Sequence, residues 1–501
     1  MQIAAKSSTY HGPFDRGFWA VSAWTSGVSL LIGVFTMIRW SEWNYGYDLG
    51  IFSQVVYNVP RGFVDQPEFG THFHYHFSPI LALLWPFMAM FKSPLVLQWA
   101  AIVLIGAVTP MIYVLFRPYA DARTSFRIAL CSLFNPFLYS QSFNEFHELC
   151  FLPILVVLLM WALDREHWAA ACAISISLFC VREDAAITGI VALIVIAIIA
   201  VLRSRTLDAS PRGLILGEPY HARKLMWLSL AMACVGILTI GTYFLYAKEN
   251  LGGWEPASFY HYSFATTPFG VVVALFLQPM QSWPTLLTLG RIGYLFEAMI
   301  CTILLPLRSR WLILAIPGLA VVLLANSIGV WRIGAQYALL WVPWLMVAFG
   351  EAFVGLAPEK RGRWFLACSG VLAAIALVGN PLHLGTYLRP SYDDLADARR
   401  ALARVGNVAL STHDEWQTHI SVADPLANSV ISPTSQWFIY ASDYPNKHFQ
   451  TVIKPTIECM VKKGAIRVFK RYGRVIIYRR VPHRTGYKVC SAITRKSSPK
   501  V

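Results

Sequence analysis

The sequence predicts a mostly α-helical, polytopic membrane protein that ends in a small α/β domain. Hydrophobic residues make up 56% of the 501 residues and charged residues only 14%, whereas a soluble globular domain carries about 25% charged residues. The chain also holds 18 Trp, 22 Tyr and 30 Phe, and aromatic side chains gather where a bilayer meets water. This composition excludes a soluble enzyme, a disordered scaffold and a fibrous repeat.

Long apolar runs define the membrane spans. A helix needs about 20 apolar residues to cross a bilayer. The run 78–91 would cover only about 21 Å of a hydrocarbon layer about 30 Å thick, so it is expected to lie on the membrane surface, and the run 269–280 is interpreted in the same way. We expect eleven spans, several of them short, at 18–39, 95–116, 126–142, 148–164, 168–182, 186–203, 225–247, 290–307, 311–328, 337–356 and 364–381.

The distribution of Lys and Arg sets the orientation of these spans, because cytoplasmic loops carry the excess. Residues 1–17 lack the pattern of a removable signal peptide, so we expect a cytoplasmic start and a first span that stays as an anchor. With this start inside, cytoplasmic segments hold 16 Lys and Arg, and outer segments before residue 365 hold 7. The transmembrane domain is then 18–381, and residues 382–501 lie outside the cytoplasm.

The C-terminal part changes character from Ser391 onwards. A helix-like stretch, SYDDLADARRALARVG, precedes the strand-like runs NVAL, AIRVF and GRVIIYRR. We expect an α/β domain of about 110 residues, with its last dozen residues loose. After residue 364 the chain holds 19 basic and 8 acidic residues. Without a nucleic-acid motif, this charge favours anionic lipid or phosphate as the partner; a basic soluble domain without such a partner is the alternative.

Cysteine usage adds one expectation. Seven of the nine Cys lie singly in or beside apolar runs, as small buried residues do. Cys459 and Cys490 are the two in the C-terminal part. If that part faces an oxidising compartment, these two can form a disulfide.

Polar residues collect at the outer ends of the predicted spans. Placing an ionisable group at membrane depth costs free energy, so such groups are functional candidates by default. Because short loops at one end of a bundle cannot diverge far, we expect them to face one cavity. The clusters are Glu42, Tyr45, Tyr47 and Asp48; His72, His74 and His76; Asn144, Glu145, His147 and Glu148; and Arg182, Glu183 and Asp184, followed by Glu249, Glu255, His261, Glu297, Arg332 and Gln336.

Each cluster also has a purely structural interpretation. Asp48 is placed as a solvated residue at a helix end would be. The alternating histidines fit an extended strap with all three on one face. The turn that starts at Arg182 fits a helix cap or a local ion pair. The occurrence of such clusters in four consecutive outer loops favours a functional site.

Four segments carry a family resemblance: YDLGIFSQVVYN from Tyr47, HFSPILALLWP from His76, FHE from Phe146 and REDAA from Arg182. They resemble the bacterial membrane-protein family called domain of unknown function 2079 and, more broadly, the GT-C superfamily of membrane glycosyltransferases that use polyprenyl-phosphate sugars. The resemblance covers roughly residues 40 to 440.

The chain departs from that family pattern at three places. The family usually shows His-Pro-Glu where this chain has His147, Glu148 and Leu149. It usually shows Lys where Arg182 stands, which keeps the charge. A His-Tyr pair is common where Gln336 precedes Tyr337, which argues against a strict metal site there.

The resemblance implies an inverting sugar transfer at the extracytoplasmic face of the inner (plasma) membrane. Asp48 matches the acidic residue that acts as general base on the acceptor hydroxyl. Arg182 is the first candidate for binding the donor phosphate, because a guanidinium grips two phosphate oxygens; Arg291 and Arg332 follow. A divalent cation, Mg or Mn, is a candidate cofactor. The polar or metal site comprises His76, His147, Glu183 and Asp184, and the substrate pocket comprises Tyr47, Gln54, His72, Glu145, Glu148 and Tyr337.

The same resemblance names the partners. The donor is a polyprenyl-phosphate-linked sugar, held in a groove that the surface helix around Trp85 helps to form. The acceptor is an envelope glycan, lipid or protein, and nucleic acid is not expected. On the acceptor side, Asp414, Glu415 and Trp416 stand out, although a polar helix start is the favoured interpretation of that stretch.

Two other classes of protein remain open. A transporter or lipid flippase would use the same charged cluster as a binding or proton site. Against it, the chain shows no inverted repeat, and its charged groups sit at one membrane face. A non-catalytic envelope assembly or sensor protein is the other alternative, and only the chemistry of Asp48 and Arg182 distinguishes it from an enzyme.

Overall fold

In the computed structural model the chain forms two compact units. The membrane unit comprises Met1–Gly33, Phe73–Leu81 and Ala100–Leu382, and the C-terminal unit comprises Val34–His72, Ala82–Trp99 and His383–Val501. The residues described are 12, 14–65, 70–205, 219–251, 270, 273–274, 277–325, 329–378, 390–406, 408–422, 427–429, 431–482 and 490.

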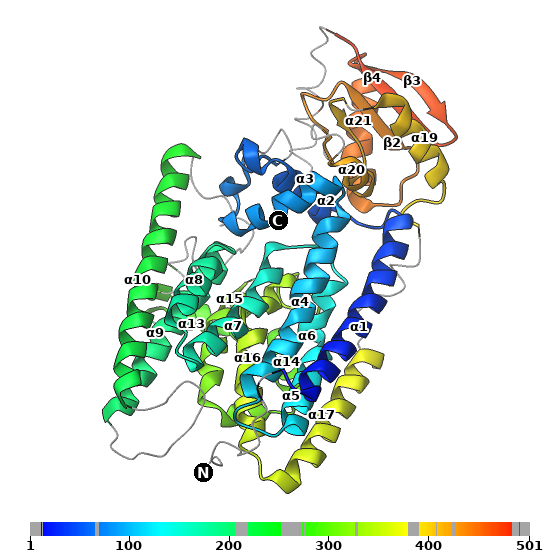
Figure 1. Cartoon of the computed structure of the whole chain (residues 1–501). Helices are drawn as coiled ribbons and strands as arrows, with labels where there is room; N and C mark the ends of the chain where they lie inside the picture. Colours follow the sequence, from blue (N-terminus) through cyan, green and yellow to red (C-terminus); the bar gives the residue numbers. More distant parts are fainter. Residues whose placement is uncertain are drawn as a thin grey trace. The chain divides into compact units, whose positions relative to one another are not determined.

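Helices make up the membrane unit (Figure 1). Two of them, α1 (Arg16–Ser41) and α4 (Leu95–Phe116), run from one unit into the other. The others are α5 (Ala122–Leu133), α6 (Pro136–Tyr139), η4 (Ser140–Ser142), η5 (Glu148–Phe151), α7 (Leu152–Asp164), α8 (Trp168–Phe179), α9 (Glu183–Arg205), α10 (Pro219–Asn250), α13 (Pro279–Leu286), α14 (Leu289–Ile300), η6 (Leu305–Arg308), η7 (Arg310–Ala315), α15 (Ile316–Leu324), η8 (Gln336–Leu340), α16 (Val342–Val354) and α17 (Pro358–Val378).

As far as the structure describes them, all eleven predicted spans fall on helical segments, and α4 has the predicted bounds. Among the described residues, four helices are long and apolar enough to cross a membrane: α1, α4, Glu183–Leu202 of α9 and Ala222–Asn250 of α10. The run 78–91 is also helical, as η3 (Pro79–Leu84) and α3 (Trp85–Phe91). The run 269–280 lies largely outside the described residues, as do Glu255 and His261.

Several predicted spans are broken, which corrects the expectation of continuous helices there. The run 126–142 is divided between α5 and α6, because Pro136 cannot continue a helix and Asn135 caps a new one by accepting a hydrogen bond from the Phe137 N–H at 3.1 Å. After α14, Ile303 and Leu304 adopt φ values of 48° and 60°. Such left-handed backbone interrupts an α-helix, so the run 290–307 is broken as well.

Close packing joins the helices of the membrane unit. Helices α9 and α10 run side by side (Figure 1). A Cβ atom on Gly236 of α10 would lie 2.6 Å from Ile190 of α9 and 2.8 Å from Phe179 of α8, so glycine permits this approach. Helix α16 forms the centre of the unit, and nearly all of its side chains are buried, including Trp344, Phe349 and Phe353.

The C-terminal unit contains a four-stranded sheet in the order β1-β2-β4-β3. Strands β1 and β2 are parallel, and the other neighbouring pairs are antiparallel. Apolar residues of the sheet pack with helices into one core. The elements are α2 (Tyr47–Tyr57), η1 (Val59–Arg61), α19 (Leu395–Val405), β1 (Leu410–Ser411), α20 (Asp414–Ile420), β2 (Trp437–Ala441), η9 (Phe449–Ile453), α21 (Lys454–Lys462), β3 (Ile466–Tyr472) and β4 (Val475–Arg480), and η2 (His72–His74) lies at the boundary of the two units.

Most of this domain was predictable from its sequence pattern. The expected helix is α19, and the runs NVAL, AIRVF and GRVIIYRR overlap β1, β3 and β4. Strand β2 (WFIYA) was missed, because it lies in a stretch interpreted as polar connections. The stretch around Trp416 begins a helix, α20, as favoured.

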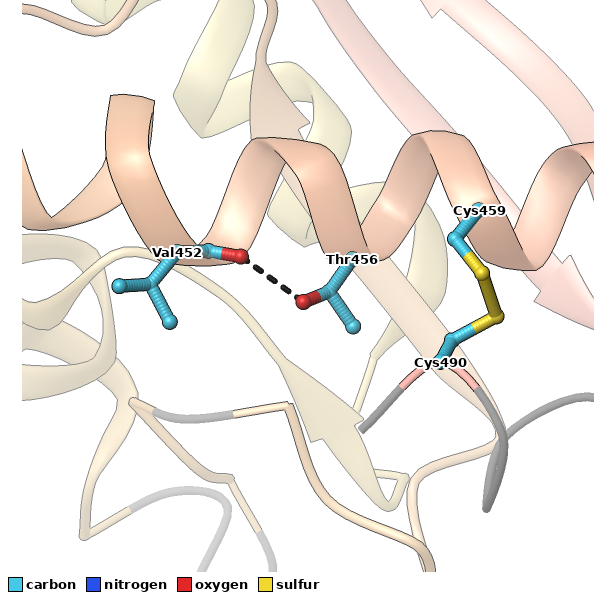
Figure 2. Close-up of a disulfide and its surroundings, with 4 residues drawn as sticks. All are labelled: Val452, Thr456, Cys459 and Cys490. Atoms are coloured by element: carbon cyan, nitrogen blue, oxygen red, sulfur yellow. Dashed lines mark hydrogen bonds between the residues drawn. A yellow bond between two sulfur atoms is a disulfide. The ribbon is translucent and has the colours of Figure 1, made fainter. Parts of the chain in front are cut away.

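The predicted disulfide is present. Cys459 of α21 and Cys490 are bonded, with their Cα atoms 5.8 Å apart (Figure 2). One turn earlier on the same helical segment, the Thr456 hydroxyl donates to the Val452 carbonyl at 2.8 Å (Figure 2). The bond ties the chain at residue 490 to α21.

The loop after α1 and helix α2 belong to the C-terminal unit. Trp43 is part of its hydrophobic core. The Thr418 hydroxyl of α20 donates to the Gly46 carbonyl at 2.6 Å, and the Gln54 amide of α2 donates to the Ala427 carbonyl at 2.9 Å. The outer domain expected at 382–501 therefore shares one compact unit with residues 34–72 and 82–99.

Candidate functional site

A buried charge network lies at the amino-terminal end of α9 in the membrane unit. Arg182 donates from Nε and Nη2 to the two carboxylate oxygens of Asp184, at 2.8 Å and 2.5 Å. Its Nη1 donates to Glu148 Oε1 at 3.2 Å. Arg182 is 1% exposed and Glu148 is fully buried. Asp184 also accepts from the Ala185 N–H at 2.7 Å, so it caps the first turn of α9 while binding the guanidinium.

A second pair extends this network. His76 Nδ1 lies 2.8 Å from Glu183 Oε1, and the Phe77 N–H donates to Glu183 Oε2 at 2.9 Å. Burial by itself would lower the pKa of His76, but the carboxylate of Glu183 outweighs burial, and the pKa is raised above its usual value. The charge network is defined here as His76, Glu148, Arg182, Glu183 and Asp184.

Helix η8 contacts this network through Tyr337. The ring of Tyr337 lies over the Arg182 guanidinium, 5.0 Å from its centroid. Gln141 donates to the Ala335 carbonyl at 3.1 Å, and Asn144 donates to the Gly334 carbonyl. The residues after α6 therefore hold the loop that leads into η8, and η8 carries Tyr337.

Three of the four predicted clusters thus lie together, as expected. The histidine run contributes His76, the loop before α7 contributes Glu148, and the turn before α9 contributes the other three members of the network. Three carboxyl groups face one guanidinium and one imidazole, so acidic groups outnumber basic groups in the network. Such groups are costly to bury, which favours a functional role over a merely structural one.

The fourth cluster lies in the C-terminal unit. Tyr47 and Asp48 occupy the first turn of α2 and are half-buried. Gln54, further along α2, is buried against residue 427, and His72 is buried with its ring 5.5 Å from that of Phe52. These four predicted site residues therefore belong to a different unit from the charge network.

The remaining predicted residues have distinct surroundings in the membrane unit. Arg291 is buried, donates to the Ala325 carbonyl at 2.8 Å and lies 5.3 Å over the ring of Trp331. Arg332 is exposed. His147 Nδ1 lies 3.0 Å from the Glu145 carbonyl oxygen, and Glu145 is half-buried.

Within the described part of the chain, no three His, Cys, Asp or Glu side chains are grouped to hold a metal ion. His76 and Glu183 bind each other, and Asp184 binds Arg182. These atoms are engaged with protein partners, whereas Glu148 Oε2 is buried and has no hydrogen-bond partner among the described residues.

Sequence reasoning missed two residues that position the site. The Tyr243 hydroxyl of α10 donates to the Phe73 carbonyl at 2.9 Å and so anchors the histidine run. Gln141 holds the loop after residue 331. Gln141 could have been identified, because a polar amide side chain is unusual within a predicted span. Tyr243 could not, because a single Tyr in an apolar helix commonly marks the membrane interface.

Residues 43–416 match the family described as "Predicted membrane protein (DUF2079)". The chain belongs to this family. The matched region includes every predicted site residue, in both units, and the family accounts for the four motif segments. None of the curated proteins matches the chain in sequence.

The membrane fold expected from the resemblance is supported by a solved structure. The chain is similar to the crystal structure of ArnT from Cupriavidus metallidurans bound to undecaprenyl phosphate, with a TM-score of 0.50 and 12% identity. The similarity covers 92% of this chain and 99% of that chain. At this level of identity it establishes a GT-C-like membrane fold for this member of the family.

Proposed function

We propose that the protein is an inverting membrane glycosyltransferase that moves a sugar from a polyprenyl-phosphate donor to an envelope glycan, lipid or protein. The observation that carries this proposal is the fold shared with ArnT over nearly the whole of both chains. That neighbour is bound to undecaprenyl phosphate, so a polyprenyl phosphate is the donor lipid we assign here. The buried charge network favours a functional site over a helical bundle with a purely structural role.

Asp48 is the proposed general base. Its half-buried carboxylate, in the first turn of α2, would accept the proton of an acceptor hydroxyl as that oxygen attacks the anomeric carbon. The bond from this carbon to the lipid phosphate breaks, and the phosphate leaves with the bonding electron pair. A positioned carboxylate contributes about 10²–10⁴-fold to such a step.

Phosphate binding is assigned first to Arg332. Among the three predicted arginines it is the exposed one, and it lies in the loop that Asn144 and Gln141 hold. Arg182 remains a candidate, but it must exchange Asp184 or Glu148 for a phosphate oxygen. Until that exchange, Arg182 acts by holding two carboxylates in place.

The orientation follows from the same proposal. The site lies at the extracytoplasmic face of the plasma membrane, with the amino terminus in the cytoplasm. A disulfide in the C-terminal unit supports this placement, because disulfides persist in oxidising compartments. The bias of Lys and Arg supports it independently.

The decisive experiment measures binding and turnover of polyprenyl-phosphate sugars by the purified protein in nanodiscs. Wild type transfers or slowly hydrolyses a sugar, whereas Asp48→Asn binds the donor and loses about 10²–10⁴-fold in turnover. Glu42→Gln is the matched control, because Glu42 is a carboxylate in the loop that leads to α2 and its backbone, through the N–H and the carbonyl, makes the hydrogen bonds with Ile38 and Ser391. A fully active Asp48→Asn, or no binding of any lipid-linked sugar by wild type, contradicts the proposal.

A divalent cation, Mg or Mn, stays a separate prediction, and no step is assigned to it. Addition of EDTA to the same assay checks it. Loss of turnover that returns with Mg or Mn supports a cation, and unchanged turnover removes it from the mechanism.

A lipid transporter or flippase is the second candidate function. The observation that favours it is the His76–Glu183 pair, since a buried imidazole and carboxylate suit proton coupling. Movement of a fluorescent polyprenyl phosphate across liposomes by a protein that transfers no sugar supports this alternative.

A further inference from the structure

A cavity of about 340 Å³ lies within the C-terminal unit, apart from the residues assigned above to sugar transfer. Its volume falls in the range of small-molecule sites, which is roughly 300–1,000 Å³. The walls come from the segment after α1, from α19 and β1, and from α20. The lining residues are Trp43, Arg399, Leu402, Ala403, Gly406, Leu410, His419 and Ile420.

One wall is an aromatic stack with an unsatisfied polar atom. The ring of His419 lies 3.8 Å from the ring of Trp40 and 4.6 Å from the ring of Trp43, measured between centroids. Burial, together with the charge of Arg399, lowers the pKa of His419 to about 3, so the ring is neutral. Its Nε2 atom is buried and has no hydrogen-bond partner among the described residues. A ligand group can therefore donate to it or accept from it.

The backbone of Trp43 is strained where it forms this wall. Its φ is 53°, a left-handed conformation that is unusual for a bulky side chain. Such conformations are unfavourable and concentrate at binding and catalytic sites. Here the strain places the indole in the core, where it is 9% exposed and stacks on His419.

Arg399 supplies a positive charge to the cavity. Its guanidinium lies 5.4 Å over the ring of Trp43, and its Nη2 donates to the Ser41 carbonyl at 3.0 Å. The nearby carboxylate of Asp397 pairs with Arg400 instead. Within the described part of the chain no carboxylate is paired with Arg399, so its charge is available to an anion.

The other walls are apolar, and Trp43 follows closely on a helix that is long and apolar enough to cross a membrane. Leu402, Leu410 and Ile420 offer no group to a small hydrophilic ion. Helix α1 is long and apolar enough to cross a membrane and ends at Ser41, two residues before Trp43. A membrane lipid is therefore the ligand class that this cavity favours.

We propose that this cavity binds one anionic membrane lipid, with its phosphate on Arg399 and the first part of its chain against Leu402, Leu410 and Ile420. His419 Nε2 would bond a hydroxyl or ester oxygen of the same lipid. This site is independent of the proposed glycosyl transfer, because neither Asp48 nor the charge network lines the cavity.

The test uses the full-length protein in nanodiscs and a diazirine-bearing phosphatidylglycerol as the probe. Wild type is expected to be labelled within residues 395–420. Arg399→Gln reduces this labelling about fivefold, as the loss of one cation near an anionic headgroup predicts. Arg404→Gln is the matched control, because Arg404 is exposed on the same helix and does not line the cavity.

A second pair of variants tests the cavity itself. Ala403→Phe fills it and abolishes the labelling, whereas Ala396→Phe, an exposed position of α19 outside the lining, leaves it intact. Retention of the Cys459–Cys490 disulfide on a non-reducing gel shows that each variant folds. If Ala403→Phe fails to fold, the comparison of Arg399→Gln with Arg404→Gln carries the test.

Competition distinguishes a lipid from a soluble phosphate ester. Unlabelled phosphatidylglycerol is expected to suppress the labelling, and glycerol 3-phosphate at the same concentration is not. Equal competition by glycerol 3-phosphate assigns the site to soluble phosphate esters and overturns the lipid proposal. Equal labelling by a diazirine-bearing phosphatidylcholine, or equal labelling of Arg399→Gln and wild type, overturns the role of Arg399.

Discussion

At the scale of single residues, buried charge determines what the candidate site can do. Arg182 holds Glu148 and Asp184 together in an environment almost closed to water. Removing one member of a buried ion pair is far more damaging than losing an exposed pair, because it leaves an uncompensated charge in a medium of low polarity.

Arg182→Gln is therefore expected to destabilise the membrane unit by about 3–5 kcal/mol. Arg182→Lys retains the charge and is expected to cost less, although it loses the bidentate contact with Asp184. Thermal unfolding in nanodiscs measures both, with the exposed Arg332→Gln as the control. Equal loss in the lysine and glutamine variants would show that charge is not what matters at this position.

The raised pKa of His76 predicts a pH dependence of stability. Because the folded protein binds the proton more tightly than an unfolded chain with a pKa of 6.5, the pair with Glu183 contributes its full stability below that pH. This contribution is lost as the pH rises through the folded-state pKa. The difference in melting temperature between wild type and His76→Gln should shrink on going from pH 5.5 to pH 9. His74→Gln serves as the control, and a difference that grows with pH would refute the pairing.

At the scale of elements, close approach of helices positions the residues around the charge network. A Cβ atom on Gly318 of α15 would lie 2.6 Å from the Leu340 carbonyl carbon, at the end of η8. Backbone cannot yield as a side chain does, so only glycine fits there. Because η8 also carries Tyr337, this contact helps to fix the ring over Arg182.

Gly318→Ala is expected to destabilise the protein by about 1–3 kcal/mol through overpacking and to lower donor turnover, if turnover is found. Gly370→Ala is the matched control, because a Cβ there meets nothing within 4 Å and alanine favours a helix. Thermal unfolding compares the two. Equal stability of the two variants would mean that η8 can shift without cost.

At the scale of the whole molecule, the sequence predicted which segments are helical better than it predicted where they break. Hydrophobicity located every predicted span on a helix, but it does not register local backbone features such as Asn135-Pro136 or the left-handed Leu304. The polar clusters in short loops anticipated that His76, Glu148 and Arg182 lie close together. It did not anticipate that α2 and the C-terminal domain form one unit, because their contacts join residues more than 370 positions apart, as in the hydrogen bond between Thr418 and Gly46.

The disulfide makes a further prediction at this scale. It closes a loop with a sequence separation of 31, and cross-linking a loop of this length stabilises a domain by about 3–4 kcal/mol in the chain-entropy account. Replacing both cysteines, as Cys459→Ser with Cys490→Ser, should lower the melting temperature of the C-terminal unit. Cys234→Ser, at an exposed free thiol, is the control. Unchanged melting of the double variant would show that α21 holds residue 490 without the bond.

The same covalent loop also bears on how the protein withstands proteases. Both strands of the hairpin, β3 and β4, lie between Cys459 and Cys490. A single cut anywhere within this loop leaves the two pieces joined, so neither strand can diffuse away from the sheet. A nicked molecule would therefore migrate as one chain until it is reduced, and the sheet could keep its place after damage that would release an unlinked C-terminus.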